Sequence, residues 1–427
     1  MSFDKLPDGW KLIPLEDAMD AIIDYRGKTP KKTESGIPLI TAKIVKGGYI
    51  LEPFEFIAVN NYDSWMVRGL PKIGDVVLTT EAPLGETAQL TNANVALAQR
   101  IVTLRGKKGL LDNDYLLCAL QSDFVQHQLE SRSSGSTVKG IKQSELRKVT
   151  LPVPPLDEQQ QIARILKSLS NKLVCNIQTS KTLEEMAQAI FKSWFVDFDP
   201  VKAKMNGEQP EGMDAATASL FPEKLDSETD SPEGWKLSEI GDEVTVVGGG
   251  TPSTKNDDFW VDGDIHWTSP KDLSGVQDKV LLDTASKVTE AGLKKISSGL
   301  LPVDTVLLSS RAPVGYLALA KVPMAINQGY IAMKCEKQLP PEFVIQWCVH
   351  RMDEIKQRAS GSTFAEISKK SFKPISVIVP NEDVLCAYQR IVKPLYDAIT
   401  SNARQNEQLS SVRDTLLPKL LSGEVAL

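Results

Sequence analysis

The chain has 427 residues and a formal net charge of −6, with 49 lysine and arginine residues against 55 aspartate and glutamate residues. Its hydrophobic content of 41% is typical of a folded globular protein and excludes a mostly disordered chain. At roughly 150 residues per domain the length predicts two or three domains. The acidic balance argues at first sight against nucleic-acid binding, which favours a basic surface.

The start of the chain, MSFDKLPDGWKL, lacks the charged and then apolar pattern of a secretory signal. No apolar run approaches the roughly 18 residues of a membrane helix. The five cysteines are far apart and form no CxxC pair, and the three histidines are isolated. We therefore expect reduced thiols, a cytoplasmic location and no metal site.

Several short motifs occur twice, in the same order and at nearly constant spacing. GWKL at 9–12 returns at 234–237, and SGST at 134–137 returns unchanged at 360–363. The pairs Thr29-Pro30 and Ala82-Pro83 return as Thr251-Pro252 and Ala312-Pro313. This repetition predicts a duplicated protein with about 225 residues in each copy.

Each copy is expected to begin with a mixed globular part. The predicted strands cover 37–44 and 75–80 in the first copy and 265–269 and 305–310 in the second. The predicted helices cover 116–129 and 343–357. Proline-containing segments at 151–155 and 377–380 end the two globular parts.

After each of these segments, apolar residues recur at alternating spacings of three and four, the pattern of a coiled-coil seam. The first seam contains Ile162, Leu166, Leu169, Leu173, Leu183, Met186, Ile190 and Trp194. The second contains Leu385, Tyr388, Val392, Leu395, Ile399, Leu409, Val412 and Leu416. Both seams become polar midway, at Asn176 and at Asn402 and Asn406. We expect two antiparallel helices, each roughly 50–57 Å long, that act as a spacer between the globular parts.

The segment between the copies differs in composition from the rest of the chain. Residues 200–231 lack periodicity and are rich in glycine, proline, serine and acidic residues, which predicts a linker. Residues 197–231 contain nine acidic residues and three lysines, so their net charge of −6 equals that of the whole chain. The acidic total therefore describes the linker and does not exclude a nucleic-acid partner.

The expected fold class is α+β (mixed), with two globular α/β domains separated by two long antiparallel coiled-coil helices and related by an internal pseudo-twofold repeat. The expected boundaries are 1–152 for the first globular domain, 153–198 for the first helix, 199–231 for the acidic linker, 232–380 for the second globular domain and 381–427 for the second helix.

No catalytic motif is present in both copies. Gly27-Lys28-Thr29 resembles the end of a Walker A loop, but Ile22 occupies the position of the required first glycine. The second copy, Gly248-Gly249-Gly250-Thr251, has no lysine there. GxSxG, HExxH and the NPP[YF] tetrapeptide of amino-methyltransferases do not occur. The pattern predicts a chain without a catalytic, cofactor or metal site of its own.

Basic residues cluster in loops of both copies. Residues 24–48 and 132–148 each carry a net charge of +4, and residues 351–373 hold six basic against three acidic residues. Lysine, arginine and small hydroxyl residues in loops suit phosphate contacts, although a solvated face can have the same composition. The matching placement in both copies favours phosphate contacts. The candidates are Lys28, Lys31, Lys32, Lys43, Ser136, Lys139 and Lys142 in the first copy and Lys271, Ser362, Lys369 and Lys370 in the second.

Polar loops follow the predicted strands at 75–80 and 305–310. Glutamate can accept from cytosine, arginine can bind guanine, and glutamine can pair with adenine in the major groove. The flanking sequences match between the copies while these side chains differ, as two parts that read different sequences would require. The candidates are Thr29, Thr80, Glu81, Gln99 and Arg100 in the first copy and Thr251, Ser253, Thr254, Lys255, Ser310, Arg311 and Gln328 in the second.

Nearly the whole chain resembles the specificity subunit of type I restriction-modification systems. The most specific segments are GSTVKGIKQSELRKVTLPVPPLDEQQQIARIL at 135–166, AIFKSWFVDFDPVKAKMNG at 189–207 and TLLPKLLSGEV at 415–425. The first copy departs from the family pattern with LAQR at 97–100, where INQG is expected. In the second copy the PLPxxEQ element has become VPNEDVLCAYQRIV.

The resemblance implies two target-recognition domains, each of which reads one half of a split, asymmetric double-stranded DNA sequence. It implies that two modification subunits bind S-adenosylmethionine and methylate adenine, and that restriction subunits that use ATP and Mg²⁺ join them. The helices would fix the spacing and dock these partners. The residues expected to bind these partners are Ile162, Leu166, Leu169, Leu173, Trp194, Phe195, Leu395, Ile399, Leu409, Leu416 and Leu420.

Three other interpretations remain open from the sequence. The chain could be a two-headed coiled-coil scaffold that binds proteins without DNA specificity. It could be a stand-alone enzyme such as a fused methyltransferase, although no S-adenosylmethionine motif is found. It could also be a specificity subunit that works with a different enzymatic partner.

Overall fold

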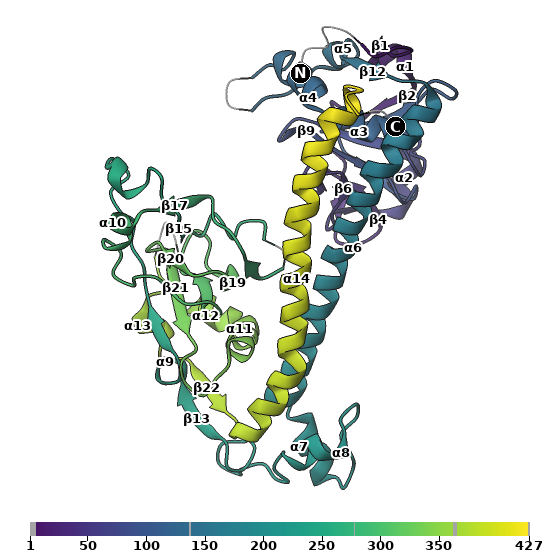
Figure 1. Cartoon of the computed structure of the whole chain (residues 1–427). Helices are drawn as coiled ribbons and strands as arrows, with labels where there is room; N and C mark the ends of the chain where they lie inside the picture. Colours follow the sequence, from purple (N-terminus) through teal and green to yellow (C-terminus); the bar gives the residue numbers. More distant parts are fainter. Residues whose placement is uncertain (1–5, 136–137, 277, 362–364, 426–427) are drawn as a thin grey trace. The chain divides into compact units, whose positions relative to one another are not determined.

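A computed structural model describes residues 6–135, 138–276, 278–361 and 365–425 (Figure 1). The chain divides into two compact units. Unit 1 comprises Met1–Val174 and Glu407–Leu427, and unit 2 comprises Cys175–Asn406. Two helices of 40 residues, α6 (Leu156–Phe195) and α14 (Glu382–Leu421), each contribute to both units.

The described residues of unit 1 form two four-stranded sheets and two strand pairs. The first sheet has the order β2 (Met19–Asp24), β11 (Ile101–Gly106), β8 (Val76–Thr80) and β9 (Leu84–Gln89). The second has the order β10 (Ala96–Leu97), β4 (Ile37–Ile40), β7 (Phe56–Ile57) and β3 (Lys32–Thr33). β1 (Lys11–Pro14) pairs with β12 (Thr150–Val153), and β5 (Val45–Lys46) pairs with β6 (Tyr49–Ile50). The helices that precede α6 are α1 (Leu15–Ala18), η1 (Val59–Asn61), α2 (Tyr62–Trp65), α3 (Asn113–Gln121), α4 (Asp123–Ser131) and α5 (Gln143–Leu146).

Unit 2 repeats this plan. Its first sheet has the order β14 (Thr245–Val247), β21 (Tyr330–Lys334), β18 (Val306–Ser309), β19 (Leu317–Ala320) and β16 (Val280–Leu281). Its second has the order β17 (Ser286–Val288), β15 (Ile265–Thr268) and β20 (Met324–Ile326), and β13 (Lys236–Glu239) pairs with β22 (Ser376–Val379). The helices are α7 (Asp199–Met205), α8 (Ala215–Ser219), α9 (Ile240–Glu243), η2 (Asp257–Phe259), α10 (Glu290–Leu293), α11 (Pro341–His350), α12 (Met352–Gln357) and α13 (Lys369–Phe372).

In each globular part the central strand buries both of its faces. In unit 1, Val76 and Leu78 of β8 pack against α3 and α4, while Val77 points to the core that includes β4 and β10. In unit 2, Leu308 and Leu307 of β18 divide between two cores in the same way. Because successive side chains of a strand point to opposite faces, a continuous apolar run suits a strand that is covered on both sides.

The two copies share their strand pairings, which confirms the predicted duplication as a structural repeat. Lys11 pairs with Val153 in unit 1, and Lys236 pairs with Val379 in unit 2, both antiparallel. The parallel pair β4–β10 corresponds to the parallel pair β15–β20. The mixed α+β fold class is therefore confirmed.

The long helices pack against each other in an antiparallel arrangement, as predicted. In unit 2, Phe191 near the end of α6 lies 6.3 Å, between ring centroids, from Tyr388 near the start of α14. Farther along, the Asn176 amide donates to Asn406 Oδ1 at 2.9 Å. Buried polar residues in a helix pair favour one register over its neighbours, because a shift would leave their amides unpaired.

The structure differs from the predicted helices in two details. The predicted helix 116–129 is interrupted at Ser122, an extended residue whose Oγ accepts from Val125 N at the start of α4. Arg351 separates α11 from α12 in the same way. In the long helices Met186 and Val412 are 47% and 45% exposed, so these two seam assignments are wrong. A 3.6-residue helix drifts away from a strict alternation of three and four residues, which moves such positions off the buried face.

The segment predicted to be a linker contains the helices α7 and α8. Val201 and Phe221 within it are fully buried in the unit 2 core, where the Trp194 ring lies 5.0 Å from the Phe221 ring. Helices of five to seven residues are too short to show a reliable period in the sequence. The anchoring of these helices therefore depends on tertiary packing.

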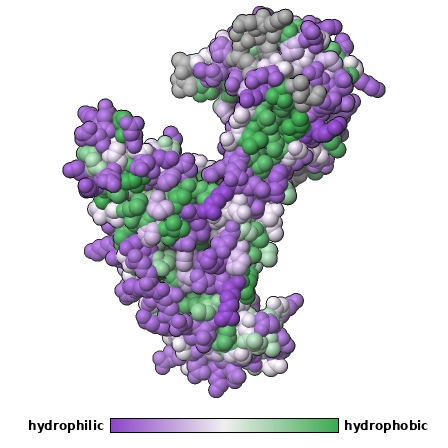
Figure 2. All heavy atoms as spheres, in the orientation of Figure 1, coloured by the Kyte–Doolittle hydropathy of each residue, from purple (hydrophilic) through white to green (hydrophobic). Residues whose placement is uncertain are grey.

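Charged and polar residues cover most of the face shown in Figure 2. A patch of hydrophobic surface lies over the unit 1 segments of α6 and α14 (Figure 2). A search of the described residues for a helix both long and apolar enough to span a membrane gave none.

Candidate nucleic-acid interface

Two of the candidate residues, Gln99 and Gln328, lie just after the end of a strand that pairs in parallel with its neighbour. In unit 1, β4 and β10 run parallel, and Ala98 N donates to Ile40 O at 3.0 Å, so Thr41 and Gln99 follow adjacent strand ends. The carboxyl ends of neighbouring parallel strands lie at one edge of a sheet, where side chains from distant parts of the chain meet.

Unit 2 has the same framework. β15 and β20 run parallel, and Asn327 N donates to Thr268 O at 2.9 Å. Ser269 and Gln328 then occupy the positions that Thr41 and Gln99 have in unit 1.

A hydrogen bond between threonine and glutamine occurs in both copies. Gln99 Nε2 donates to Thr29 Oγ1 at 3.4 Å, and Thr251 Oγ1 donates to Gln328 Oε1 at 2.6 Å. In each copy this bond joins the Thr-Pro loop to the loop that follows the parallel strand. The structure thus brings together two loops that the sequence analysis selected separately.

The Ala-Pro loop meets the Gly/Ser-rich loop in both copies. Glu81 forms a β-bridge with Gly140, and Arg311 forms one with Glu366. Ala82 and Ala312 both have a φ of 51°, in the left-handed region that non-glycine residues rarely adopt. The Ala-Pro loop therefore has the same backbone conformation in both copies.

Two of the predicted base-reading residues are buried. Thr80 is 1% exposed and Ser310 is 3% exposed. Their backbones hold the loops together: Thr80 N donates to Arg100 O at 2.9 Å, and Ser310 N donates to Gly329 O at 2.8 Å. The assignment of these two side chains to base contacts is therefore wrong, and they position Glu81 and Arg311. Ser136 and Ser362 lie outside the described residues.

Charged side chains surround the Ala-Pro loop of unit 1. Arg100 forms an ion pair with Glu81 at 3.9 Å. One pocket of about 280 Å³ is lined by Lys32, Thr41, Ala42, Lys43, Glu55, Ala82, Ala98, Gln99 and Arg100. A second, of about 460 Å³, is lined by Ala82, Pro83, Leu84, Glu130, Val138 and Lys139. Because Ala82 lines both, the two pockets lie on either side of the same loop.

Sequence analysis missed Glu55 and Thr41 as site residues. Lys32 and Lys43 pair with Glu55 Oε1 at 2.8 and 3.3 Å. The hydrogen bond from Lys32 lowers the pKa of the Glu55 carboxyl, so the group is ionised at neutral pH. Glu55 stands outside every motif, and Thr41 lies within the predicted strand 37–44, which in the structure already ends at Ile40.

Unit 2 has a pocket in the corresponding place. It has a volume of about 710 Å³ and is lined by Ala312, Pro313, Val314, Gly315, Tyr316, Lys356, Ala359 and Ala365. Lys356 belongs to the basic stretch 351–373 but was not chosen as a site residue. The Lys369 side chain lies over Gly248, beside the loop that leads to Thr251.

The remaining candidates are exposed but are not joined to these pockets. In the part of the chain that the structure describes, their side chains form no hydrogen bond or ion pair. They are Lys28, Lys31, Lys142, Ser253, Thr254, Lys255, Lys271 and Lys370. Exposed lysines outside the pockets can still contact phosphates, which need no defined pocket.

Most of the predicted partner-contact residues form the core of this chain. Seven of them are at least 92% buried, and they are Ile162, Leu166, Leu173, Trp194, Phe195, Ile399 and Leu420. All of these except Leu173 belong to the hydrophobic core of one unit, so these six side chains pack within the chain and their assignment to partner contacts is corrected. Leu169, Leu395, Leu409 and Leu416 retain partial exposure.

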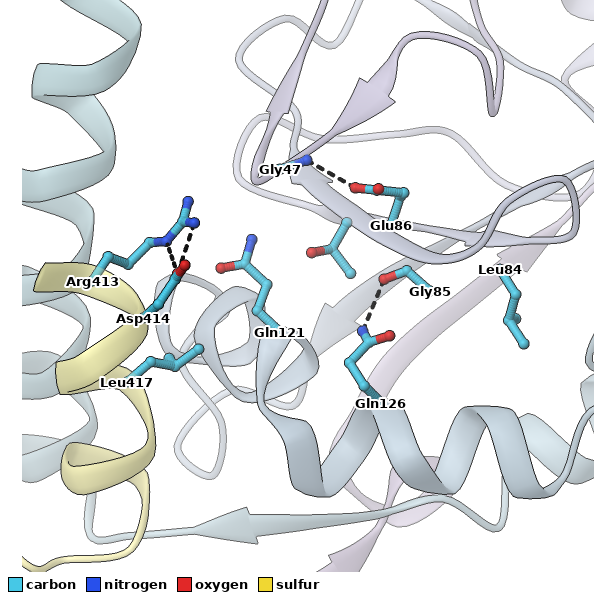
Figure 3. A pocket seen from close by; sticks show the side chains of 10 residues that line it. Gly47, Leu84, Gly85, Glu86, Gln121, Gln126, Arg413, Asp414 and Leu417 are labelled. Atoms are coloured by element: carbon cyan, nitrogen blue, oxygen red, sulfur yellow. Dashed lines mark hydrogen bonds and ion pairs between the residues drawn. The ribbon is translucent and has the colours of Figure 1, made fainter. Parts of the chain in front are cut away.

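Another pocket of unit 1 lies where the last turns of α14 meet the globular part (Figure 3). It has a volume of about 250 Å³, and Arg413, Asp414 and Leu417 of α14 line one side. Across the pocket, Gln126 Nε2 donates to Gly85 O at 2.9 Å. None of the predicted DNA-contacting residues is among those that line it, so it marks the attachment of α14.

Comparison with known proteins identifies the family. The family model for the type I restriction modification DNA specificity domain matches residues 7–185 and 232–411. The HindI specificity subunit of Haemophilus influenzae is 27% identical over 378 residues, which cover 78% of this chain and 79% of that protein. The MjaIX specificity subunit of Methanocaldococcus jannaschii is 26% identical over 99% of this chain and 94% of that protein.

A solved structure shares the fold. The type I restriction-modification S subunit from M. genitalium has a TM-score of 0.56 at 16% identity and covers 98% of this chain and 96% of that one. Specificity subunits are non-catalytic and carry no cofactor of their own, in agreement with the sequence analysis. The chain therefore belongs to the type I restriction-modification DNA specificity family and serves as the DNA specificity subunit of such a complex.

Proposed function

We propose that the two globular parts read two different halves of a split, asymmetric DNA sequence. We call residues 6–155 head 1 and residues 232–381 head 2, close to the boundaries expected from the sequence for the two target-recognition domains. One observation carries the proposal: both heads have the same backbone framework but different polar side chains on it. Glu81 and Arg100 in head 1 correspond to Arg311 and Gly329 in head 2.

These substitutions change which bases can be recognised. A glutamate accepts from the amino group of cytosine, whereas an arginine donates to O6 and N7 of guanine. Exposed lysines such as Lys139 and Lys356 would hold the phosphate backbone and fix the orientation of each head. The family assignment sets aside both the protein-binding scaffold and the fused methyltransferase.

We further propose that α6 and α14 set the spacer between the half-sites and that two modification subunits dock on this chain. Those subunits would supply S-adenosylmethionine and methylate one adenine in each half-site, in the cytoplasm, and restriction subunits that use ATP and Mg²⁺ would join them. Methylation requires the target adenine to leave the base stack, so the heads must bind distorted DNA.

The test is to map methylated adenines in cells that carry the modification subunits, with and without this chain. A bipartite motif with a constant spacer is expected only with the chain present. Replacing residues 1–152 with the equivalent domain of another specificity subunit should change one half-site and leave the other intact. A single continuous motif, or a change in both half-sites, would contradict the proposal.

A further inference from the structure

The pocket beside the Ala82 loop of head 1 contains two polar groups that are not satisfied. Thr41 is 8% exposed, and the described residues provide no hydrogen-bond partner for its hydroxyl. The same holds for Glu55 Oε2, while Oε1 binds Lys32 and Lys43. Buried polar groups are almost always paired, so two orphans that line one pocket require an explanation.

At the matching position in head 2, the hydroxyl has a hydrogen-bond partner within the protein. Ser269, the counterpart of Thr41, donates its hydroxyl to Asp272 Oδ2 at 3.0 Å. The Asp272 carboxylate also accepts from Ser269 N at 2.7 Å and from Ala285 N at 3.0 Å. Head 2 therefore satisfies at this place the hydrogen bonds that head 1 leaves open.

The chemistry of these two unsatisfied groups determines which ligand atoms can pair with them. An ionised carboxylate can only accept, so Glu55 Oε2 requires a donor, whereas the Thr41 hydroxyl can donate or accept. In the major groove only cytosine N4 and adenine N6 present amino donors, and the groove edges of guanine and thymine present acceptors. An acceptor opposite Glu55 would leave Oε2 of this carboxylate without a donor, at a cost in affinity.

The rim of the pocket suits DNA. The side chains of Lys32 and Lys43 are 44% and 64% exposed, and Arg100 and Gln99 line the same pocket. The lysine ammonium groups can contact a phosphate next to the base. Any ammonium that turns toward a phosphate would also weaken its hold on Glu55 and increase the need of this carboxylate for another donor.

We propose that the Thr41–Glu55 pocket of head 1 receives the exocyclic amino group of an adenine or cytosine in its half-site, and that head 2 lacks this contact. The proposal rests on the proposed function, because it assigns one base contact within the half-site that head 1 reads. It makes Glu55 and Thr41 specificity-determining residues.

The test combines two variants with single-atom changes in the DNA. The complete complex of this chain with its modification subunits is bound to DNA in which one amino group at a time is deleted, by purine in place of adenine or 2-pyrimidinone in place of cytosine. For the wild type, one position in the head 1 half-site should lose about tenfold more affinity than the others. Glu55→Gln and Thr41→Val should reduce this excess loss, because the deleted amino group and the altered side chain form one interaction.

Matched controls separate the pocket from general effects. Ser269→Ala changes the counterpart hydroxyl in head 2, and Glu34→Gln removes a carboxylate from an exposed loop position of head 1. Both should keep the wild-type pattern of losses. The half-site of head 2 and the spacer should be unchanged in every variant, which also shows that the variant complex is folded.

The outcomes distinguish this inference from the proposed function. Suppose that the wild-type complex has a bipartite motif, but that deleting the amino group lowers the affinity as much in Glu55→Gln and Thr41→Val as in the wild type. The pocket proposal is then wrong and the proposed function stands. If the wild-type complex has no bipartite motif, the proposed function itself fails. If Glu55→Gln does not assemble, the isosteric Thr41→Val variant decides, and additive losses with it overturn the proposal.

Discussion

Head 1 and head 2 share a framework but differ in how they close the end of their parallel strands. In head 2, Asp272 pairs with Ser269, and Tyr330 OH donates to Ser269 O at 2.6 Å. In head 1, Thr41 and Glu55 line a pocket, and the described residues provide no hydrogen-bond partner for Thr41 Oγ1 or Glu55 Oε2. A duplicated protein can therefore keep one backbone for two tasks, because the fold is specified by strand pairing and recognition by a few side chains at strand ends.

The largest expected effect is on the stability of head 2, and it depends on how tightly this head holds its Thr-Pro loop. A Cβ on Gly249 would lie 1.8 Å from Ile326 O, whereas at the neighbouring Gly250 the nearest atoms are 3.9 Å away. Gly249→Ala should destabilise head 2 by about 3 kcal/mol, because the overlap is with backbone that cannot move without strand β20. Gly250→Ala is the matched control, and thermal unfolding measures both. Equal stability of the two variants would show that the loop is not held against β20.

A second prediction concerns the attachment of each head to the long helices. In unit 2, Glu184 of α6 is 13% exposed and binds Lys279 at 2.6 Å and Gln346 Nε2 at 2.9 Å. Glu184→Ala should cost about 2–3 kcal/mol, because it leaves buried partners unpaired. In unit 1, the Lys167–Asp114 pair has side chains that are 43% and 36% exposed, and Asp114→Ala should cost below about 1 kcal/mol. Urea unfolding of the two variants compares them, and a larger loss for Asp114→Ala would reverse the ranking.

A third prediction compares the lysines beside the two Ala-Pro loops. Lys139 in head 1 and Lys356 in head 2 line corresponding pockets. Lys139→Gln and Lys356→Gln should each weaken DNA binding for all sequences alike. Each should reduce the slope of log affinity against log salt by roughly 0.9, the value for one phosphate contact. Salt titrations of binding to target and unrelated DNA measure this, and a sequence-dependent loss would argue for a base contact instead.

The smallest expected effect concerns pH. The hydrogen bond from Lys32 lowers the pKa of Glu55, so the stabilisation by this pair is complete above the ordinary carboxyl range and is lost as pH falls through the lowered pKa. Between pH 6 and 8 the methylation motif should not change. The difference in unfolding free energy between the wild type and Glu55→Gln should be smaller at acid pH than at neutral pH, and unfolding measured at each pH tests this. A difference that stays constant would show that folding does not change the pKa of Glu55.

Much of the architecture could be predicted because it depends on local and periodic signals. The duplicated motifs predicted the repeat, and the spacing of Ile162, Leu166 and Leu173 predicted the first long helix with these residues buried. The polar midpoint at Asn176 was also visible and now forms hydrogen bonds to Gln405 and Asn406. The order of residues is sufficient for such features, because a helix or a strand has a fixed period.

The candidate site could be predicted only in part. The Thr-Pro, Ala-Pro and Gly/Ser loops were selected separately in the sequence, and only the structure shows which of them meet. Thr80 and Ser310 proved to be buried. The alternation along a strand that is covered on both faces does not reveal which residue at its end reaches the surface. Met186 and Val412 failed for a related reason, because helix packing decided which of several apolar neighbours lies inside.

The sequence by itself determined the duplication, the two long helices, the acidic composition of residues 197–231 and the basic loops, since each is a property of residue order and spacing. Only the tertiary structure decided that Glu55 and Thr41 line one pocket, and that Asp272 binds the Ser269 hydroxyl at the matching place in head 2. Glu55 and Thr41 come to the same pocket because β7 pairs with β4, and this pairing joins positions that no local pattern relates. Recognition depends on such long-range neighbours, so it becomes visible only once the strands are paired.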